Sequence, residues 1–452
     1  MTDTIDGPVP PGDNPEGRPD DTTSPGAATR GSAMTPDALV VLAPDVMAES
    51  LGVYIRAWLK RIRSGESGAL PIIIGLIVIC IFFQIQSHVF LSSGNIVNLL
   101  VQSAFFILLG MGELYALLMG DIDLSVGFVG AVGATVTIGL ISPPYSWPWW
   151  AGVIVGMLAA ALIGLLQGTL ITRLKIPSFV VTLAGLLGWQ GVLIFLFDFD
   201  KGSTGGVLRV SNDVVYNLVN GNMTVWSGWV LMIVLVGGFA ALTLIRAANR
   251  RSHGLSAPPL SVTLFTIAGV AVAGGALVYV CNLNRGALAP LQGVPFVIPF
   301  VVAVLVFQTA LLGRTKLGRY IYAIGASPEA ARRAGINVNL IRTIAFGLCS
   351  FTSGLAALVY ASRLGSISVG FDGGTYVLFA VAAAVIGGAS LAGGYGKAIH
   401  PVLGGLVIAA LTNGLDLLNI STAGTDVATA VVLIVAVAVD ATLRRRGRPA
   451  TF

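Results

Sequence analysis

Long apolar runs separated by short polar stretches dominate the chain from residue 69 onward. Each run is close to the ~20 residues that an α-helix needs to cross the hydrocarbon core of a bilayer. Backbone groups in hydrocarbon must satisfy their own hydrogen bonds, which favours helices over isolated strands. We expect membrane-spanning segments at residues 69–91, 95–119, 125–141, 147–171, 178–197, 225–245, 260–281, 293–312, 342–361, 375–392, 398–419 and 425–443. Because Gly-rich runs can be re-entrant, the pattern predicts an all-α polytopic membrane protein with about 10–12 transmembrane helices.

The composition agrees with this pattern. Of the 452 residues, 55% are hydrophobic and 10% are charged, and the mean hydropathy is +0.87. Ordinary soluble domains have about 25% charged residues, so a soluble globular fold is excluded. Cys80, Cys281 and Cys349 are isolated in apolar segments and indicate neither a disulfide framework nor a metal site.

Basic residues gather between the apolar runs and predict the topology. Short loops rich in Lys and Arg stay on the cytoplasmic side of a membrane. Clusters follow the fourth, sixth, eighth and twelfth expected spans: Arg173 and Lys175; Arg246, Arg250 and Arg251; Arg314, Lys316 and Arg319; Arg444, Arg445, Arg446 and Arg448. We therefore expect both termini to be cytoplasmic and the connection 198–224 to lie outside. Clusters placed in this way indicate topology and not nucleic-acid binding.

The two ends of the chain differ from its apolar body. Residues 1–44 are rich in Pro, Gly, Asp and Thr, which predicts a disordered cytoplasmic tail. Residues 45–68 place apolar and basic side chains on different helical faces, which predicts an amphipathic helix lying on membrane lipid. The transmembrane domain then covers residues 69–443, and a basic cytoplasmic tail covers residues 444–452.

The stretch 313–342 interrupts the apolar pattern with six basic residues and one acidic residue. Because buried charge is costly in a membrane, we expect this stretch in water on the cytoplasmic side. Ser327, Pro328 and Glu329 can begin a short helix there, and Gly335 can end it. A capped, charged helix of this kind is suited to contact a cytosolic partner. The alternative is a structured loop without a partner.

Asp121 and Asp123 lie between apolar runs in the stretch 120–127. Glycine permits an unwound backbone there, and carboxylates near a bilayer need water, a partner or protein dipoles. The alternative is a cytoplasmic turn in which Asp123 or Ser125 caps the next helix. The spacing of Gly120, Leu124 and Gly127 recurs at Gly387, Leu391 and Gly394, a match too short to assign an internal repeat.

Polar side chains within the expected spans can line a path for a hydroxyl-rich solute, although each can instead bond a neighbouring helix. They are Gln102, Glu113, Gln167, Thr182, Trp189, Gln190 and Asn413. The candidate translocation path consists of Asp121, Asp123, Ser125, Thr182, Trp189, Gln190 and Asn413.

The polar loop resembles the EAA-x-x-x-G loop of ABC importer permeases, with Glu329-Ala330-Ala331 followed by Gly335. With Gly318-Arg319-Tyr320 and Ala323-Ile324-Gly325 before it, the run is similar to the monosaccharide branch, which includes ribose, galactose and xylose permeases. The stretches 120–127, 176–183, 386–394 and 413–415 extend the resemblance over residues 70–443. The extra hydrophobic length around 225–281 resembles the xylose-type permeases most.

This resemblance implies import of xylose or a similar pentose or hexose, driven by a separate ATPase subunit. It implies that the loop that couples to the ATPase includes Gly318, Arg319, Glu329, Ala330, Ala331 and Gly335. It also implies an extracytoplasmic sugar-binding protein and a second permease copy in a homodimer as partners. No cofactor is expected, since the partner subunit binds the ATP.

Other features bear on the substrate and on catalysis. Val377 and Phe379 stand where family members commonly carry an acidic pair. Ala398 follows Gly396-Lys397 where a P-loop needs Ser or Thr, so we expect no ATPase and no other enzyme activity in this chain. The three histidines lack metal-ligand spacing, so no metal is expected. The alternatives are a stand-alone secondary transporter or channel, or an ABC permease for a nucleoside or branched-chain amino acid.

Overall fold

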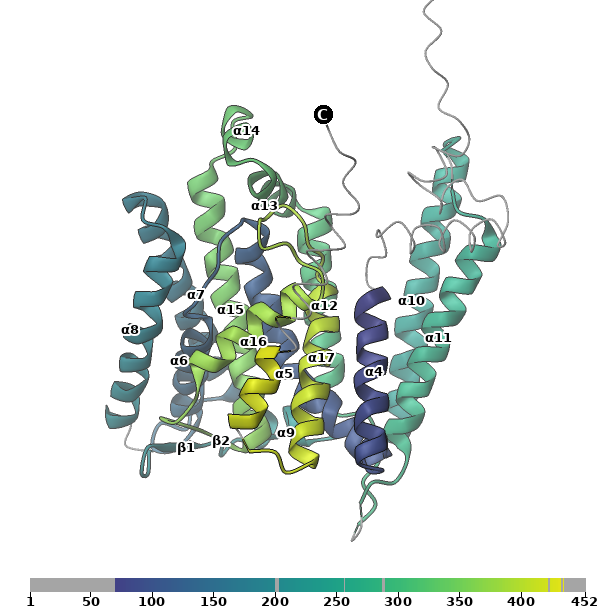
Figure 1. The fold of residues 1–452 in the computed structure, drawn as a ribbon, viewed down its shortest axis with the longest axis horizontal. Coiled ribbons are helices and arrows are strands. Elements are labelled where there is room, and N and C mark those ends of the chain that lie inside the picture. The colour runs from purple at the N-terminus through teal and green to yellow at the C-terminus, as the bar shows by residue number, and fades with distance from the viewer. Residues whose placement is uncertain are drawn as a thin grey trace, which may run out of the picture.

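The computed structural model describes residues 70–199, 203–255, 257–286, 289–421, 423–431 and 434. In this part of the chain, eight helices are long and apolar enough to cross a membrane, and three shorter apolar helices accompany them. The fold is therefore that of an all-α polytopic membrane protein, as predicted (Figure 1). The predicted tail 1–44, interfacial helix 45–68 and basic tail 444–452 lie outside the described residues, as does most of the last expected span.

The apolar helices follow the expected spans closely, with most ends shifted by a few residues. They are α4 (Leu70–Gln86), α5 (Ser93–Leu118), α6 (Val126–Ile141), α7 (Trp149–Leu174), α8 (Ser178–Phe199), α10 (Val225–Ser252), α11 (Leu260–Asn282), α12 (Val297–Arg314), α15 (Val338–Leu364), α16 (Gly373–Ile386) and α17 (His400–Leu417).

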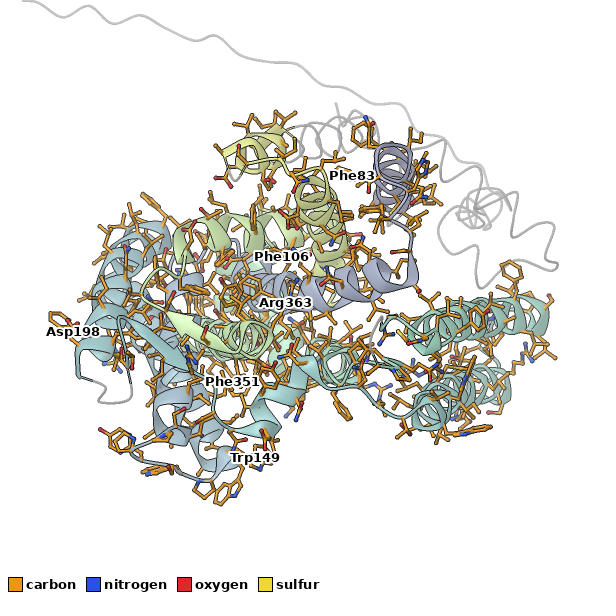
Figure 2. The ribbon with its side chains drawn as sticks, turned by 90° about the horizontal axis from the view of Figure 1, so that it is seen from below. Phe83, Phe106, Trp149, Asp198, Phe351 and Arg363 are labelled. Carbon is orange, nitrogen blue, oxygen red and sulfur yellow. The ribbon has the colours of Figure 1, made fainter. Side chains whose placement is uncertain are left out.

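Helix α5 is the centre of the bundle, and most of its residues from Ser103 to Leu118 are buried. It packs against α15, α16 and α17, while α15 also packs against α6 and α7. Small residues let these helices approach closely. A Cβ atom on Gly130 of α6 would lie 2.5 Å from the Ser353 carbonyl oxygen of α15. Figure 2 shows Phe106 of α5 near the middle of the molecule and Trp149 of α7 at its edge.

Helices α8, α10 and α11 lie at the periphery. Only a small fraction of each is buried within the chain, and α10 and α11 pack mainly against each other. Figure 1 shows this pair on one side of the bundle and α8 on the opposite side. Lipid or another chain must cover these apolar faces, because water does not tolerate so large an apolar surface.

Short elements mark the two ends of the bundle (Figure 1). At one end, β1 (Val207–Arg209) pairs antiparallel with β2 (Ser366–Ser368), beside α9 (Asp213–Asn220). At the other end lie α13 (Lys316–Ala326) and α14 (Pro328–Arg333). We call these the β1–β2 end and the α13–α14 end. The connection 198–224 contains both a strand, β1, and a helix, α9.

Two of the three shorter apolar helices border non-helical segments: one segment precedes α6 and the other follows α16. The segment 119–125 separates α5 from α6, and the segment 387–399 separates α16 from α17. The expected span 375–392 is wrong at its end, because α16 stops at Ile386 and the Gly-rich sequence after it is not helical. We call the two segments, 119–125 and 387–399, the broken segments.

Candidate polar site between the broken segments

The two broken segments meet at the α13–α14 end of the bundle. The backbone N–H of Gly394 donates a hydrogen bond to the Leu118 carbonyl oxygen at 2.9 Å. Gly120 and Gly393 have φ angles of +77° and +85°, which side chains rarely adopt. A Cβ atom on Gly393 would lie 2.8 Å from the Gly120 nitrogen. The spacing that the sequence repeats therefore marks two segments in contact, although Gly120 meets Gly393 and not its counterpart Gly387.

Buried polar side chains surround the first broken segment. The Asp123 backbone N–H donates to Glu113 Oε1 at 3.1 Å, and both side chains are fully buried. Asp123 Oδ1 accepts from the Ser125 hydroxyl at 2.6 Å and from the Ser125 N–H at 2.9 Å. Gln167 of α7 donates from Nε2 to the Ser125 hydroxyl at 2.8 Å. Residues from α5, the broken segment and α7 thus form one hydrogen-bonded cluster.

This cluster keeps free hydrogen-bonding capacity. Among the described residues, Asp123 Oδ2 has no hydrogen-bond partner, although it is buried. Buried polar groups are normally paired, so an unpartnered carboxylate oxygen at such a site calls for a functional explanation. Ser125 stands at the start of α6 without capping it. Its hydroxyl donates to Asp123 instead, so the alternative in which Ser125 caps this helix is wrong.

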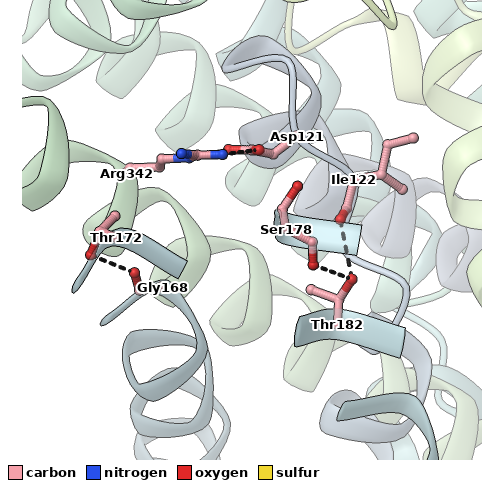
Figure 3. A network of polar contacts seen from close by, with 7 residues as sticks. All are labelled: Asp121, Ile122, Gly168, Thr172, Ser178, Thr182 and Arg342. Carbon is pink, nitrogen blue, oxygen red and sulfur yellow. Dashed lines mark hydrogen bonds and ion pairs between the residues drawn. The ribbon is translucent and has the colours of Figure 1, made fainter. Parts of the chain in front are cut away.

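Asp121 lies on the other side of the same segment and pairs with Arg342 at the start of α15. The guanidinium contacts both carboxylate oxygens, with 2.6 Å between Nε and Oδ2 (Figure 3). The Asp121 side chain is 4% exposed and that of Arg342 is 31% exposed. This bidentate pair fixes the broken segment to the helix that directly follows α14.

Two further path candidates lie close to this cluster. The Thr182 hydroxyl of α8 donates to the Ser178 carbonyl at 2.9 Å and reaches the Ile122 carbonyl at 3.4 Å (Figure 3). Trp189 and Gln167 both line a mostly apolar groove of about 420 Å³ between α7 and α8. Gln190, by contrast, is exposed on the outer face of α8.

Asn413 is not part of this cluster. Its Oδ1 accepts from Asn95 Nδ2 at 2.7 Å, and its Nδ2 donates to Gln102 Oε1 at 3.4 Å. Asn95 belongs to the first turn of α5 and Glu113 to its last turns, so about 27 Å of helix separates them. Asn413 therefore joins α17 to the opposite half of α5.

The residues of the expected coupling loop lie on α13 and α14 and directly after α14. Ser327 caps α14 by accepting from the Ala330 N–H at 3.3 Å, and Pro328 is its first residue, as the sequence predicts. Glu329 and Ala330 are exposed, Ala331 is buried, and Gly335 follows the helix with φ +81°. Gly318 is buried and Arg319 exposed on α13, which the sequence analysis did not foresee as a helix.

Three residues of this region are absent from the candidate translocation path that the sequence predicts. Glu113 and Gln167 were visible only as polar groups within spans, and Arg342 only as one of several cations near a loop. A charge at the first turn of a long apolar helix is the signal that singles out Arg342, since an unpaired one is costly near hydrocarbon. In the part of the chain that the structure describes, no group of three or more His, Cys, Asp or Glu is placed to hold a metal ion.

Comparison with known proteins gives the class to which this fold belongs. A family model described as the permease component of branched-chain amino acid transport systems matches residues 95–438. The xylose transport system permease protein of Haemophilus influenzae is 33% identical over 404 residues, 85% of this chain and 99% of that protein. Its counterpart in Escherichia coli K12 is 30% identical over 379 residues, 83% of this chain and 92% of that protein. The ribose import permease protein of H. influenzae is 28% identical over 369 residues, 81% of this chain and 91% of that protein. No solved structure matches the chain.

These findings define a multi-pass membrane permease. The chain belongs to the family of transport-system permease components that the family model describes.

Proposed function

We propose that this chain is the permease subunit of an ABC importer that carries xylose or a similar monosaccharide across the cell membrane. The observation that carries the proposal is the 33% identity over 99% of the length of a xylose permease. The relatives with 27–30% identity include permeases for xylose, allose and ribose, which supports a pentose or hexose as the substrate class.

The partners follow from this role. A separate subunit supplies ATP hydrolysis, because Ala398 stands where a P-loop needs a hydroxyl. The chain itself then needs no cofactor. An extracytoplasmic binding protein delivers the sugar, and a second permease copy completes a homodimer. The exposed apolar faces of the peripheral helices leave room for such a contact.

The α13–α14 end faces the cytoplasm in this proposal, and both termini lie on that side. Support comes from the basic residues at this end of α7, α10 and α12. The exposed, capped helix α14 presents Glu329 to the ATPase.

The sugar path passes the polar cluster of Asp123, Ser125 and Gln167. Hydroxyl-rich solutes need both donors and acceptors along their route, and this cluster offers carboxylate, hydroxyl and amide groups. Thr182 and Trp189 border the same region from α8. Asp121 and Asn413 are occupied by partners, which favours a positioning role for both.

Reconstitution tests this function. The permease, its ATPase and its binding protein in proteoliposomes should accumulate labelled xylose only with hydrolysable ATP, and an ionophore should not abolish uptake. Uptake that follows an ion gradient without ATP would establish a secondary transporter instead. The family description motivates a second substrate class: if leucine or a nucleoside is transported and xylose is not, the sugar assignment is wrong.

A further inference from the structure

Helix α13 contacts the second broken segment through the phenol of Tyr322. The Tyr322 hydroxyl donates to the Gly396 carbonyl oxygen at 2.6 Å. The side chain is half-buried, and burial raises the pKa of the phenol, so it keeps its proton and remains a donor at neutral pH.

One turn further along α13, Gly325 contacts the second broken segment and the last residue of α5, directly before the first broken segment, through backbone atoms. A Cβ atom there would lie 1.8 Å from the Leu118 carbonyl oxygen and 2.5 Å from the Gly394 nitrogen. Residues three apart lie on one helical face, so Tyr322 and Gly325 form a single contact surface on α13.

The two segments under this surface are fixed to each other and to α15. Gly393 of the second segment packs against the backbone nitrogen of Gly120 in the first, and Arg342 pairs with Asp121 of the first segment. Only Ser327 separates α13 from α14. The stretch from α13 to the start of α15 therefore holds the broken segments at both of its ends.

We infer that Tyr322 and Gly325 transmit the displacement of α14 to the second broken segment and to the end of α5, where the first broken segment begins, so that ATP hydrolysis by the partner opens the polar site at Asp123 and Ser125. This inference rests on the proposed function and names the positioning residues through which it operates. Packed backbone contacts transmit a displacement of α13 toward the segments because they cannot be compressed. The Tyr322 hydrogen bond also transmits a displacement in the opposite direction. Asp123 lies in the segment that moves.

Tyr322→Phe tests the hydrogen bond with the least change in packing. The readout is sugar transported per ATP hydrolysed in proteoliposomes that contain the permease, its ATPase and the binding protein. We expect this ratio to fall roughly fivefold, the factor that corresponds to one hydrogen bond. ATPase association and membrane abundance should remain at wild-type levels. Tyr320→Phe is the matched control, because it removes the same hydroxyl from an exposed position on the same helix.

Gly325→Ala tests the backbone contact. The added methyl group forces α13 away from Leu118. The amount of sugar transported per ATP hydrolysed should therefore fall further than in Tyr322→Phe. Gly313→Ala is its control, since no atom lies within 4 Å of a Cβ there. If Tyr322→Phe transports as many sugars per ATP as Tyr320→Phe, the transmission role of this surface is wrong. If wild-type protein shows no ATP-driven uptake at all, the proposed function fails instead.

Discussion

The first broken segment carries two carboxylates in different surroundings. Asp121 and Asp123 are only two positions apart, yet one is neutralised by Arg342 and the other lies fully buried beside Ser125. A buried carboxylate is tolerated when hydrogen bonds or an opposite charge replace its water. The same short stretch therefore contains one anchoring carboxylate and one with free acceptor capacity.

The two side chains of the Asp121–Arg342 pair differ in burial. We therefore expect variants of the two residues to differ in stability. Removing one partner of a buried ion pair costs about 3–5 kcal/mol, and partial exposure of the remaining charge reduces that cost. Arg342→Gln leaves the buried Asp121 charge unpaired, whereas Asp121→Asn leaves Arg342, which can reach water. We expect Arg342→Gln to lower the midpoint of thermal unfolding in detergent more than Asp121→Asn does. Equal losses in the two variants would contradict the assigned burial.

Asn413 should matter for stability and not for sugar recognition. Its amide bonds Asn95 and Gln102 between α17 and α5, and such bonds between membrane helices contribute about 1–2 kcal/mol. Asn413→Ala should lower the unfolding midpoint while leaving the KM for sugar uptake unchanged. Gln190→Ala, at an exposed position on α8, should leave the midpoint unchanged. A raised KM for sugar uptake in Asn413→Ala would show instead that Asn413 contributes to sugar recognition.

At the scale of elements, local signals predicted helix starts better than helix breaks. Ser327, Pro328 and Gly335 mark the ends of α14 in the sequence, and the structure places them as predicted. The end of α16 was missed, because the Gly-rich sequence after Ile386 is as apolar as a span. Its non-helical form depends on contacts with Gly120 and α13, which are distant in sequence. Helix α9 was also missed: it lies in the connection 198–224, and its side-chain cap, Asn212, was not used as a helix signal.

Helix α14 supports a prediction about its exposed acid. Glu329→Lys should leave membrane abundance unchanged, because the residue is exposed and its pair with Arg333, at 4.0 Å, contributes little. A cation facing a partner that expects an anion can cost several kcal/mol of binding, so co-purification of the ATPase and sugar uptake should both fall.

Asp213→Lys is the matched control for this variant. Asp213 is also an exposed acid in the first turn of a short helix with a side-chain cap, but α9 lies at the β1–β2 end. It should leave ATPase association intact. Wild-type association in Glu329→Lys would show that α14 does not bind the ATPase through this residue.

At the scale of the whole molecule, the spans differ in burial, and their mean hydropathy partly reflects this difference. Helices α5, α15 and α17 are the most buried of the long helices and have lower mean hydropathy than α10 and α11. A helix surrounded by protein does not need an apolar surface on every side, whereas one surrounded by lipid does. The pattern of apolar runs predicts each span but not its burial, so α5 could not be identified as the centre of the bundle from the sequence. The cluster around Glu113 and Asp123 depends on that central position, which is why its geometry could not be predicted.

The orientation of the bundle is the prediction on which the partner assignments depend. Arg173, Arg250, Arg251 and Arg314 lie in the last turns of α7, α10 and α12. From the positive-inside rule we predict that the α13–α14 end faces the cytoplasm. Single cysteines at Arg333 in α14 and Asn217 in α9, both exposed, test this in a variant without Cys80, Cys281 and Cys349. In intact cells a membrane-impermeant maleimide should label Asn217→Cys at once and Arg333→Cys only after permeabilisation. The reverse pattern would place α14 outside, where no ATPase can reach it. That result would contradict the coupling roles of Glu329, Tyr322 and Gly325.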